Sequence, residues 1–196
     1  VDLGDYTEIL GTFPGRAILD AAPDMPDAPY PVVVFSHGSG ASRFMSPYLL
    51  EHIASYGFIV LAVEHIGSNL AANMGLEPEA YAALVPSMHV RRVQDIQRVL
   101  DYAEDLATTD ELFQDVLDPS RVAVMGMSFG GYTAFAMGGA QMDITGFESM
   151  CAEVDLGEGS VEPAMCALTD AQKDELAALA GLDGAPDGLW PSIVDP

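Results

Sequence analysis

Residues 121–131 read Arg-Val-Ala-Val-Met-Gly-Met-Ser-Phe-Gly-Gly, and this stretch decides the fold that we expect for the chain. The apolar run at 122–125 predicts a buried strand, and helix-compatible residues follow the glycines at 132–137. A strand, a tight turn and a helix form the context in which Gly-x-Ser-x-Gly acts as a nucleophile elbow. Ser128 is therefore a candidate nucleophile. The alternative is an ordinary strand-to-helix crossover with an incidental serine.

The glycines beside Ser128 have a steric reason. A serine on a sharp turn needs neighbours with almost no side chain two positions before and two positions after it. Gly126 and Gly130 fill these positions, and Gly131 is expected to let the helix begin close to the strand. The helix N-terminus then lies beneath the serine, where its dipole favours negative charge developing on a substrate oxygen.

The charge of the chain limits its partners. Thirty acidic residues stand against seven basic ones, which gives a formal net charge of −23. This excess of negative charge argues against nucleic acid and against anionic membrane surfaces. Lys173 is the single lysine, a composition typical of proteins in high salt or of acidic secreted proteins. No apolar run approaches the roughly 20 residues that a membrane-spanning helix needs.

Two cysteines, Cys151 and Cys166, lie close together in the last third of the chain. Their spacing is compatible with a disulfide that closes a surface loop, and two unpaired thiols are the alternative. A disulfide would indicate an oxidising compartment, so we expect a secreted or periplasmic protein.

Three apolar, strand-like runs alternate with helical patterns before residue 139. The runs are 31–36, 58–63 and 122–125, with helices expected from Ser46-Pro47 and over 88–106. This order predicts an α/β fold, with a mostly parallel sheet between two helical layers and right-handed crossovers. Weaker strand candidates lie at 6–10 and 16–19. The helix expected at 88–106 has an apolar face and a polar face. The expected core face comprises Val90, Val93, Ile96, Val99, Leu100, Ala103 and Leu106. The expected polar face comprises Arg91, Arg92, Gln94, Asp95, Arg98 and Glu104.

We expect one domain over residues 1–196, with a core up to residue 139 and a cap-like insertion or loop region at 140–196. Residues 142–168 read as irregular. Thr169 and Gln172 form a capping-box pattern that predicts a helix over 170–180.

These features together resemble the α/β-hydrolase superfamily. The chain is most similar to the bacterial dienelactone-hydrolase-like esterases and the platelet-activating-factor acetylhydrolases. The resemblance rests on four blocks, at residues 33–38, 54–65, 92–101 and 118–131, in the order and spacing of the family. The chain differs from the family at one position of the elbow: the family usually has a histidine directly before the serine, and this chain has Met127 there.

The resemblance implies a serine esterase without a cofactor. Ser128 would be the nucleophile, and the backbone N–H groups of Ser39 and Phe129 would form the oxyanion hole. The implied substrates are short-chain acyl esters, lactones, acetylated lipids or aromatic polyesters.

The chain departs from the family pattern after the nucleophile. The superfamily triad follows the order serine, acid, histidine, and the serine needs that histidine as its general base. Here every histidine precedes Ser128, so the triad acid and histidine stay unassigned. His65 is the best substitute among the four, and His37 is expected to brace the oxyanion loop. The four histidines are His37, His52, His65 and His89.

Two consequences follow for the chain as a functional unit. The strand at 122–125 is apolar throughout, so we expect both faces buried and both edges paired. Only the strand at 32–35 is available as a partner. We therefore expect the remainder of a longer polypeptide, or a second chain, to complete the sheet and the triad. The alternative function is a non-catalytic binding or interaction protein of the same fold.

Metal and nucleotide sites are not expected. The histidines are scattered, and the two cysteines lack further ligands at zinc-site spacing. Gly38 and Gly40 lack the additional glycine and lysine of a phosphate-binding loop.

Overall fold

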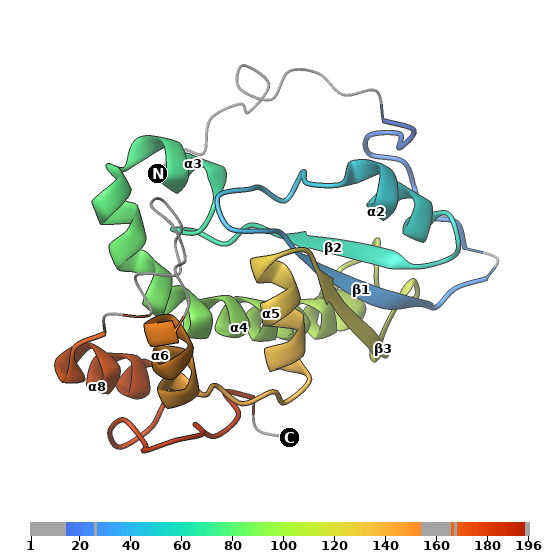
Figure 1. The fold of residues 1–196 in the computed structure, drawn as a ribbon. Helices are drawn as coiled ribbons and strands as arrows, with labels where there is room; N and C mark the ends of the chain where they lie inside the picture. Colours follow the sequence, from blue (N-terminus) through green and yellow to red (C-terminus); the bar gives the residue numbers. More distant parts are fainter. Residues whose placement is uncertain (1–14, 26, 154–165, 167, 195–196) are drawn as a thin grey trace.

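A parallel three-stranded sheet forms the centre of the molecule (Figure 1). The computed structural model describes residues 15–25, 27–153, 166 and 168–194. The strands β1 (Tyr30–Ser36), β2 (Ile59–Val63) and β3 (Leu117–Gly126) lie in the order β2-β1-β3. The register places Val33 beside Val60 on one side and beside Ala123 on the other. The predicted parallel α/β sheet is confirmed.

Burial explains this strand order. In β1 the side chains of residues 32–36 are all buried, as an apolar run in a central strand requires. The core over the sheet joins residues from all three strands to the long helix α4 (Pro78–Thr109). Its buried members are Val32, Val34, Val63, Ile96, Leu106 and Leu117.

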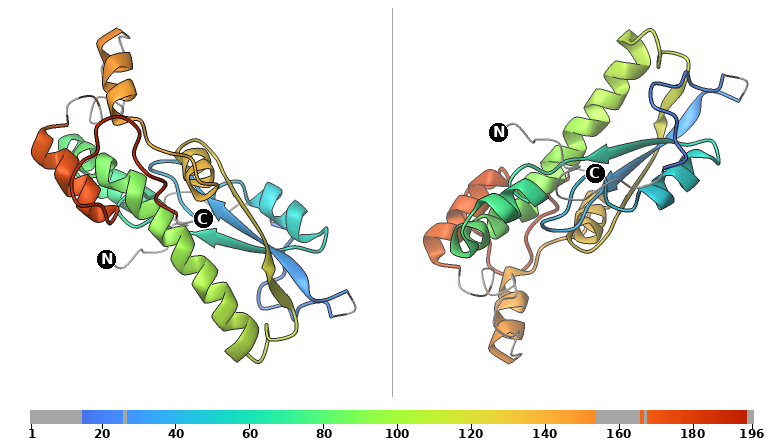
Figure 2. Two further views of the ribbon diagram at one scale, coloured as in Figure 1. Left: turned by 90° about the horizontal axis from the view of Figure 1, so that it is seen from below. Right: turned by 90° about the horizontal axis from the view of Figure 1, so that it is seen from above.

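The remaining helices flank this core. They are α2 (Pro47–Ala54), α3 (Leu70–Gly75), α5 (Phe129–Met137), α6 (Ile144–Glu153) and α8 (Asp170–Leu179). Helix α2 packs against β2, and α5 packs against β3, β1 and α4. Helix α4 is longer than the predicted 88–106, starts with Pro78 and carries Pro86 in its interior. It runs the length of the molecule, as both views in Figure 2 show.

A second apolar cluster joins the C-terminal part of the chain to α4. Trp190 is 1% exposed, and its backbone N–H donates to the carbonyl of Met142 at 2.8 Å. The side-chain amide of Gln94 donates to the carbonyl of Leu179. The buried residues of this cluster are Val90, Met142, Ile144, Leu168, Leu176, Ala177 and Trp190.

Several local predictions are corrected or confirmed by the backbone. Part of the irregular segment expected at 142–168 is the helix α6. The capping box of Thr169 and Gln172 is present at the start of α8. Residues 16–19 form no strand, because the N–H groups of Arg16 and Ala17 donate to the carboxylate of Glu51 instead of to a neighbouring strand. The strand candidate at 6–10 lies outside the described residues.

The disulfide prediction is only partly covered by the structure. Cys166 is disulfide-bonded. The side chain of Cys151 lies outside the described residues, so the pairing of these two cysteines stays a prediction.

Strand β3 forms one edge of the sheet. Within the described residues it pairs with β1 alone, as expected. The expectation that both its faces are buried is wrong for these residues, since Val122 is 39% exposed and Ala123 is exposed as well. Phe135 of α5 is also 75% exposed. Considering the described residues alone, β3 therefore has one unpaired edge and an uncovered apolar surface.

Among the described residues, no helix combines the length and apolar character that crossing a membrane would require.

Candidate active site

Ser128 adopts the strained backbone of a nucleophile elbow. Its φ is 55° and its ψ is −121°, a conformation that residues with a side chain rarely adopt and that costs about 1–3 kcal/mol. Three hydrogen bonds hold the turn: Met127 N–H to Ser36 at 3.2 Å, Gly130 N–H to Met127 at 2.9 Å, and Gly131 N–H to Ser128 at 2.7 Å. The serine side chain is exposed and does not cap the helix.

The two glycines of the pentapeptide are required by close backbone approach. A Cβ atom on Gly130 would lie 1.9 Å from the carbonyl oxygen of Ser36, and one on Gly126 would lie 2.2 Å from the carbonyl oxygen of Gly130. Gly131 differs from the expectation, because a Cβ atom there would meet nothing closer than 3.9 Å. Close packing of α5 on the sheet therefore depends on Gly130 rather than on Gly131.

Two backbone N–H groups are available beside Ser128. Phe129 is the first residue of α5, so its N–H has no acceptor within the helix. Among the described residues the N–H of Ser39 also donates to no acceptor. The loop that contains Ser39 lies against Ser128, since a Cβ atom on Gly38 would be 3.4 Å from the Cβ of Ser128. The hydroxyl groups of Ser39 and Tyr81 are hydrogen-bonded at 2.7 Å, which anchors this loop to α4.

His65 does not serve as a substitute base. Its side chain is fully buried, with Nδ1 at 2.9 Å from Asp95 Oδ2 and Nε2 at 2.9 Å from Ser36 Oγ. The carboxylate accepts from Nδ1–H, so Nε2 accepts from the Ser36 hydroxyl. Burial lowers the pKa of His65. Both ring nitrogens are occupied, so His65 is not free to act as the substitute base that the sequence suggested.

Ser36, His65 and Asp95 reproduce the hydrogen-bond order of a catalytic triad, but they form a structural network. Ser36 has no exposed surface, because it lies in the central strand beneath the elbow. No substrate carbonyl reaches a hydroxyl in this position. This network was not predicted from the sequence, because the helical pattern places Asp95 on the polar face of the helix at 88–106. The same pattern also misplaces Arg92.

Arg92 is buried, whereas the helical pattern places it on the polar face of α4. Its exposed fraction is 0%. The residues one helical turn away on either side, Met88 and Ile96, are also buried, so Arg92 lies on their stripe of the helix. That i−4 and i+4 spacing is the sequence signal that could have identified it.

His37 braces the oxyanion loop in the predicted manner. Its Nδ1–H donates to the carbonyl of Gly38 at 2.7 Å, and its Nε2 accepts from the N–H of His65 at 3.1 Å. This pattern requires a neutral ring, because Nε2 must keep its lone pair. Burial is the main cause that lowers the pKa of His37 to about 4.

We therefore expect His37 to make the protein less stable in mild acid. The folded-state pKa of about 4 is below the ordinary value of 6.5, so the unfolded state binds more protons between these two values. The contribution of His37 is complete above pH 6.5 and is lost as the pH falls toward about 4. Acidification from pH 7 to pH 5 should cost about 2 kcal/mol of unfolding free energy through this group.

An NMR titration of the imidazole signals is the direct measurement. The signals of His37 should still report a neutral ring at pH 5. A midpoint for His37 near the ordinary histidine value would contradict the hydrogen-bond assignment.

The other two histidines do not activate Ser128 either. His52 of α2 packs edge-on against the ring of Tyr56, which follows the helix. His89 is held by a hydrogen bond to the carbonyl of Val85, and its ring lies 4.7 Å from the ring of Phe129. Among the described residues, no side chain is hydrogen-bonded to the Ser128 hydroxyl. Within the same residues, no three His, Cys, Asp or Glu side chains lie together as a metal site.

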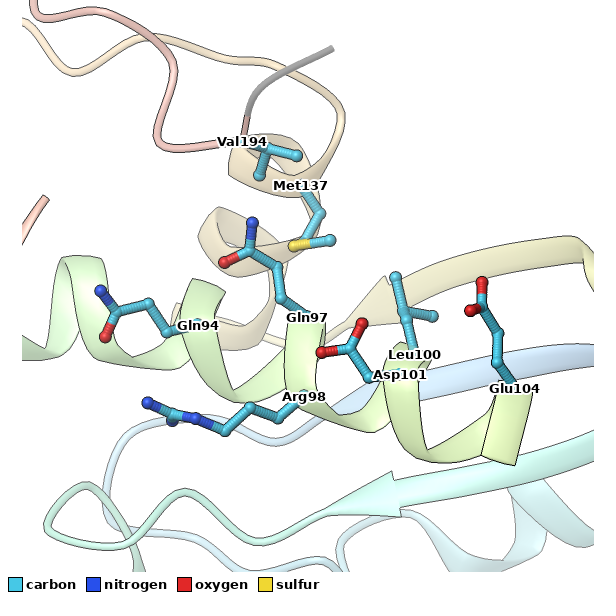
Figure 3. Close-up of a pocket in the computed structure, with 8 residues that line it drawn as sticks. All are labelled: Gln94, Gln97, Arg98, Leu100, Asp101, Glu104, Met137 and Val194. Atoms are coloured by element: carbon cyan, nitrogen blue, oxygen red, sulfur yellow. The ribbon is translucent and has the colours of Figure 1, made fainter. Parts of the chain in front are cut away.

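A surface groove of about 580 Å³ lies along α4, between that helix, the end of α5 and the C-terminal segment (Figure 3). It does not include Ser128 or either oxyanion donor. We assign it no part in the site. Its lining residues are Gln94, Gln97, Arg98, Leu100, Asp101, Glu104, Met137 and Val194.

Part of this chain is similar to known proteins. Residues 17–97 match the model of the family "Platelet-activating factor acetylhydrolase, isoform II". The platelet-activating factor acetylhydrolase of Canis lupus familiaris is 30% identical over an alignment of 136 positions that covers 53% of this chain and 31% of that protein. This chain is thus similar, over about half of its length, to proteins named as acetylhydrolases. The match spans about a third of the length of these curated relatives, 31% for the dog protein and 35% for the one from Gallus gallus.

A plant protein and a bacterial enzyme of known structure are also similar to this chain. Chlorophyllase-1 of Citrus unshiu is 29% identical over 106 residues, which are 54% of this chain and 28% of the plant protein. Among solved structures, the ferulic acid esterase from Streptomyces cinnamoneus aligns with a TM-score of 0.40 and 28% identity, over 57% of this chain and 33% of that one.

Proposed function

We propose that the chain carries the nucleophile and the oxyanion hole of a serine-dependent carboxylic ester hydrolase. Ser128 Oγ attacks the ester carbonyl, and the N–H groups of Ser39 and Phe129 donate to the oxygen that becomes negative. The strained backbone of Ser128 is the single observation that carries this proposal, because such strain persists where the surrounding structure enforces it and is concentrated at functional sites. The free N–H group of Phe129, next to it, supports the same role.

The general base comes from outside the described residues in this proposal. A serine hydroxyl is a weak nucleophile without a histidine, and the described histidines are engaged elsewhere. The free edge of β3 is the place where further polypeptide would pair with the sheet next to Ser128. That polypeptide is either the remainder of a longer chain or a second chain, and it would bring the histidine and its acid.

The substrate is a carboxylic ester of one of the classes that the resemblance to the esterase family implies: a short-chain acyl ester, a lactone, an acetylated lipid or an aromatic polyester. The disulfide at Cys166 supports a secreted or periplasmic location, because disulfides persist in oxidising compartments.

A non-catalytic ester-binding protein is the second candidate. The observation in its favour is that no described side chain activates the Ser128 hydroxyl. Hydrolysis of p-nitrophenyl acetate and of longer p-nitrophenyl esters by the complete protein, with the polypeptide that pairs with β3 present, separates the two functions. Turnover above the buffer rate that a fluorophosphonate abolishes supports the esterase. Saturable binding of the esters without turnover supports the second candidate.

A further inference from the structure

Arg92 connects the two halves of the candidate oxyanion hole. Its side chain reaches from α4 to the carboxyl end of β1, to the loop after β2 and to the start of α5. The guanidinium donates to Ser36 Oγ at 3.1 Å, Ser68 Oγ at 2.8 Å, Thr133 Oγ1 at 3.2 Å and the carbonyl oxygen of His37.

On one side Arg92 fixes the loop that leads to the first donor. It binds the side chain of Ser36 and the carbonyl of His37, the two residues before Gly38-Ser39. Because the carbonyl of His37 and the N–H of Gly38 belong to one peptide plane, this contact fixes the direction from which the chain enters the loop.

On the other side Arg92 fixes the second donor. Its guanidinium carbon lies 4.8 Å from the centre of the Phe129 ring, a cation–π contact. It also donates to Thr133, whose hydroxyl in turn donates to the carbonyl of Phe129 at 3.0 Å. The ring and the carbonyl of the residue that supplies the second donor are thus both tied to Arg92.

The stability of the fold does not by itself explain why an arginine is buried at position 92. A fully buried guanidinium is costly to desolvate, and none of the ion pairs among the described residues involves Arg92. Burial lowers the pKa of Arg92 to about 10, so the group stays charged at neutral pH. A positive charge kept beside the oxyanion hole favours the negative transition state over the neutral ester.

We propose that Arg92 is a positioning residue that sets the direction of both oxyanion N–H groups and places a fixed positive charge behind them. This inference rests on the proposed esterase function. A planar guanidinium with five donors serves all of these contacts at once, which the single ammonium group of lysine does not.

The test compares Arg92→Lys and Arg92→Met with Arg91→Lys, which changes the exposed neighbour on the same helix. We expect kcat for p-nitrophenyl acetate to fall about tenfold in Arg92→Lys and about 10²-fold in Arg92→Met, with KM within about threefold of the wild-type value. Arg91→Lys should leave kcat and KM unchanged. Wild-type kcat in folded Arg92→Lys and Arg92→Met, or a rise in KM alone, would overturn the proposal.

A second readout does not depend on turnover. The amide NMR signals of Ser39 and Phe129 should both move in Arg92→Lys and stay in place in Arg91→Lys, and unmoved signals would overturn the positioning role. If Arg92→Met fails to fold, Thr133→Val takes its place in this test, because it keeps the volume of the side chain. The amide signal of Phe129 should move in Thr133→Val. If the wild-type protein shows no turnover while these amide signals move as expected, the esterase proposal fails and the coupling of Arg92 to both amides stands.

Discussion

Ser128→Ala is expected to lower ester hydrolysis at least about 10³-fold, because removing the nucleophile of a serine hydrolase leaves only the contribution of the oxyanion hole and substrate binding. The fold should be unaffected. Ser128 is exposed, its side chain makes no capping bond, and alanine removes one oxygen atom from a surface position.

Steady-state hydrolysis of p-nitrophenyl acetate, with circular dichroism and thermal unfolding of the same samples, measures both effects. Ser149→Ala is the matched control, because Ser149 is an exposed serine of α6 whose hydroxyl donates only to the carbonyl of Thr145. Activity of Ser128→Ala within tenfold of the wild-type value would remove Ser128 from the nucleophile role.

Gly130→Ala is expected to destabilise the protein by about 3 kcal/mol or more, or to prevent folding. The added methyl group would lie 1.9 Å from the carbonyl oxygen of Ser36 and 2.9 Å from that of His37. Both contacts are with backbone of the central strand and its loop, which do not rotate away as a flexible side chain would. Helix α5 would have to move off the sheet and carry the elbow with it.

Gly131→Ala is the matched control one residue later. A Cβ atom on Gly131 is 3.9 Å from its nearest neighbour, and alanine is favoured over glycine inside a helix by up to about 1 kcal/mol. Urea unfolding should therefore show Gly131→Ala at or above the wild-type stability. Equal stability of Gly130→Ala and Gly131→Ala would contradict the close packing of α5 on β1.

The architecture around the elbow was predictable because its signals are local. Apolar runs of strand length, a Ser-Pro helix start and glycines at fixed positions around Ser128 are visible in the sequence, and the parallel sheet follows from their alternation. The buried strand β1 at the centre of the sheet is the clearest example, since every residue from Val32 to Ser36 is buried.

The buried polar network was not predictable from the same signals. Arg92 and His65 are polar residue types that sequence patterns place at surfaces or in pockets, yet both are fully buried. Their burial depends on partners distant in sequence, among them Ser36, which is 56 residues from Arg92. A helical pattern reports which stripe a residue occupies, but not whether polar groups of other elements meet it there.

The start of α4 and the burial of β3 show a different limit of prediction from sequence. Residues 78–87 join α4 although their apolar pattern is weaker, and Tyr81 and Val85 of this part are buried. The exposure of Val122 and Ala123 depends on what lies beside β3, and a run of apolar residues predicts burial without saying what supplies it.

Covalent labelling of the folded protein with a fluorophosphonate, followed by peptide mass spectrometry, tests the nucleophile assignment most directly. We expect one adduct, located on Ser128, that forms on the native protein and is absent after heat denaturation and in Ser128→Ala. An adduct on a different residue would contradict this assignment. So would the absence of an adduct on the complete protein, with the polypeptide that supplies the histidine present and the fold verified by circular dichroism.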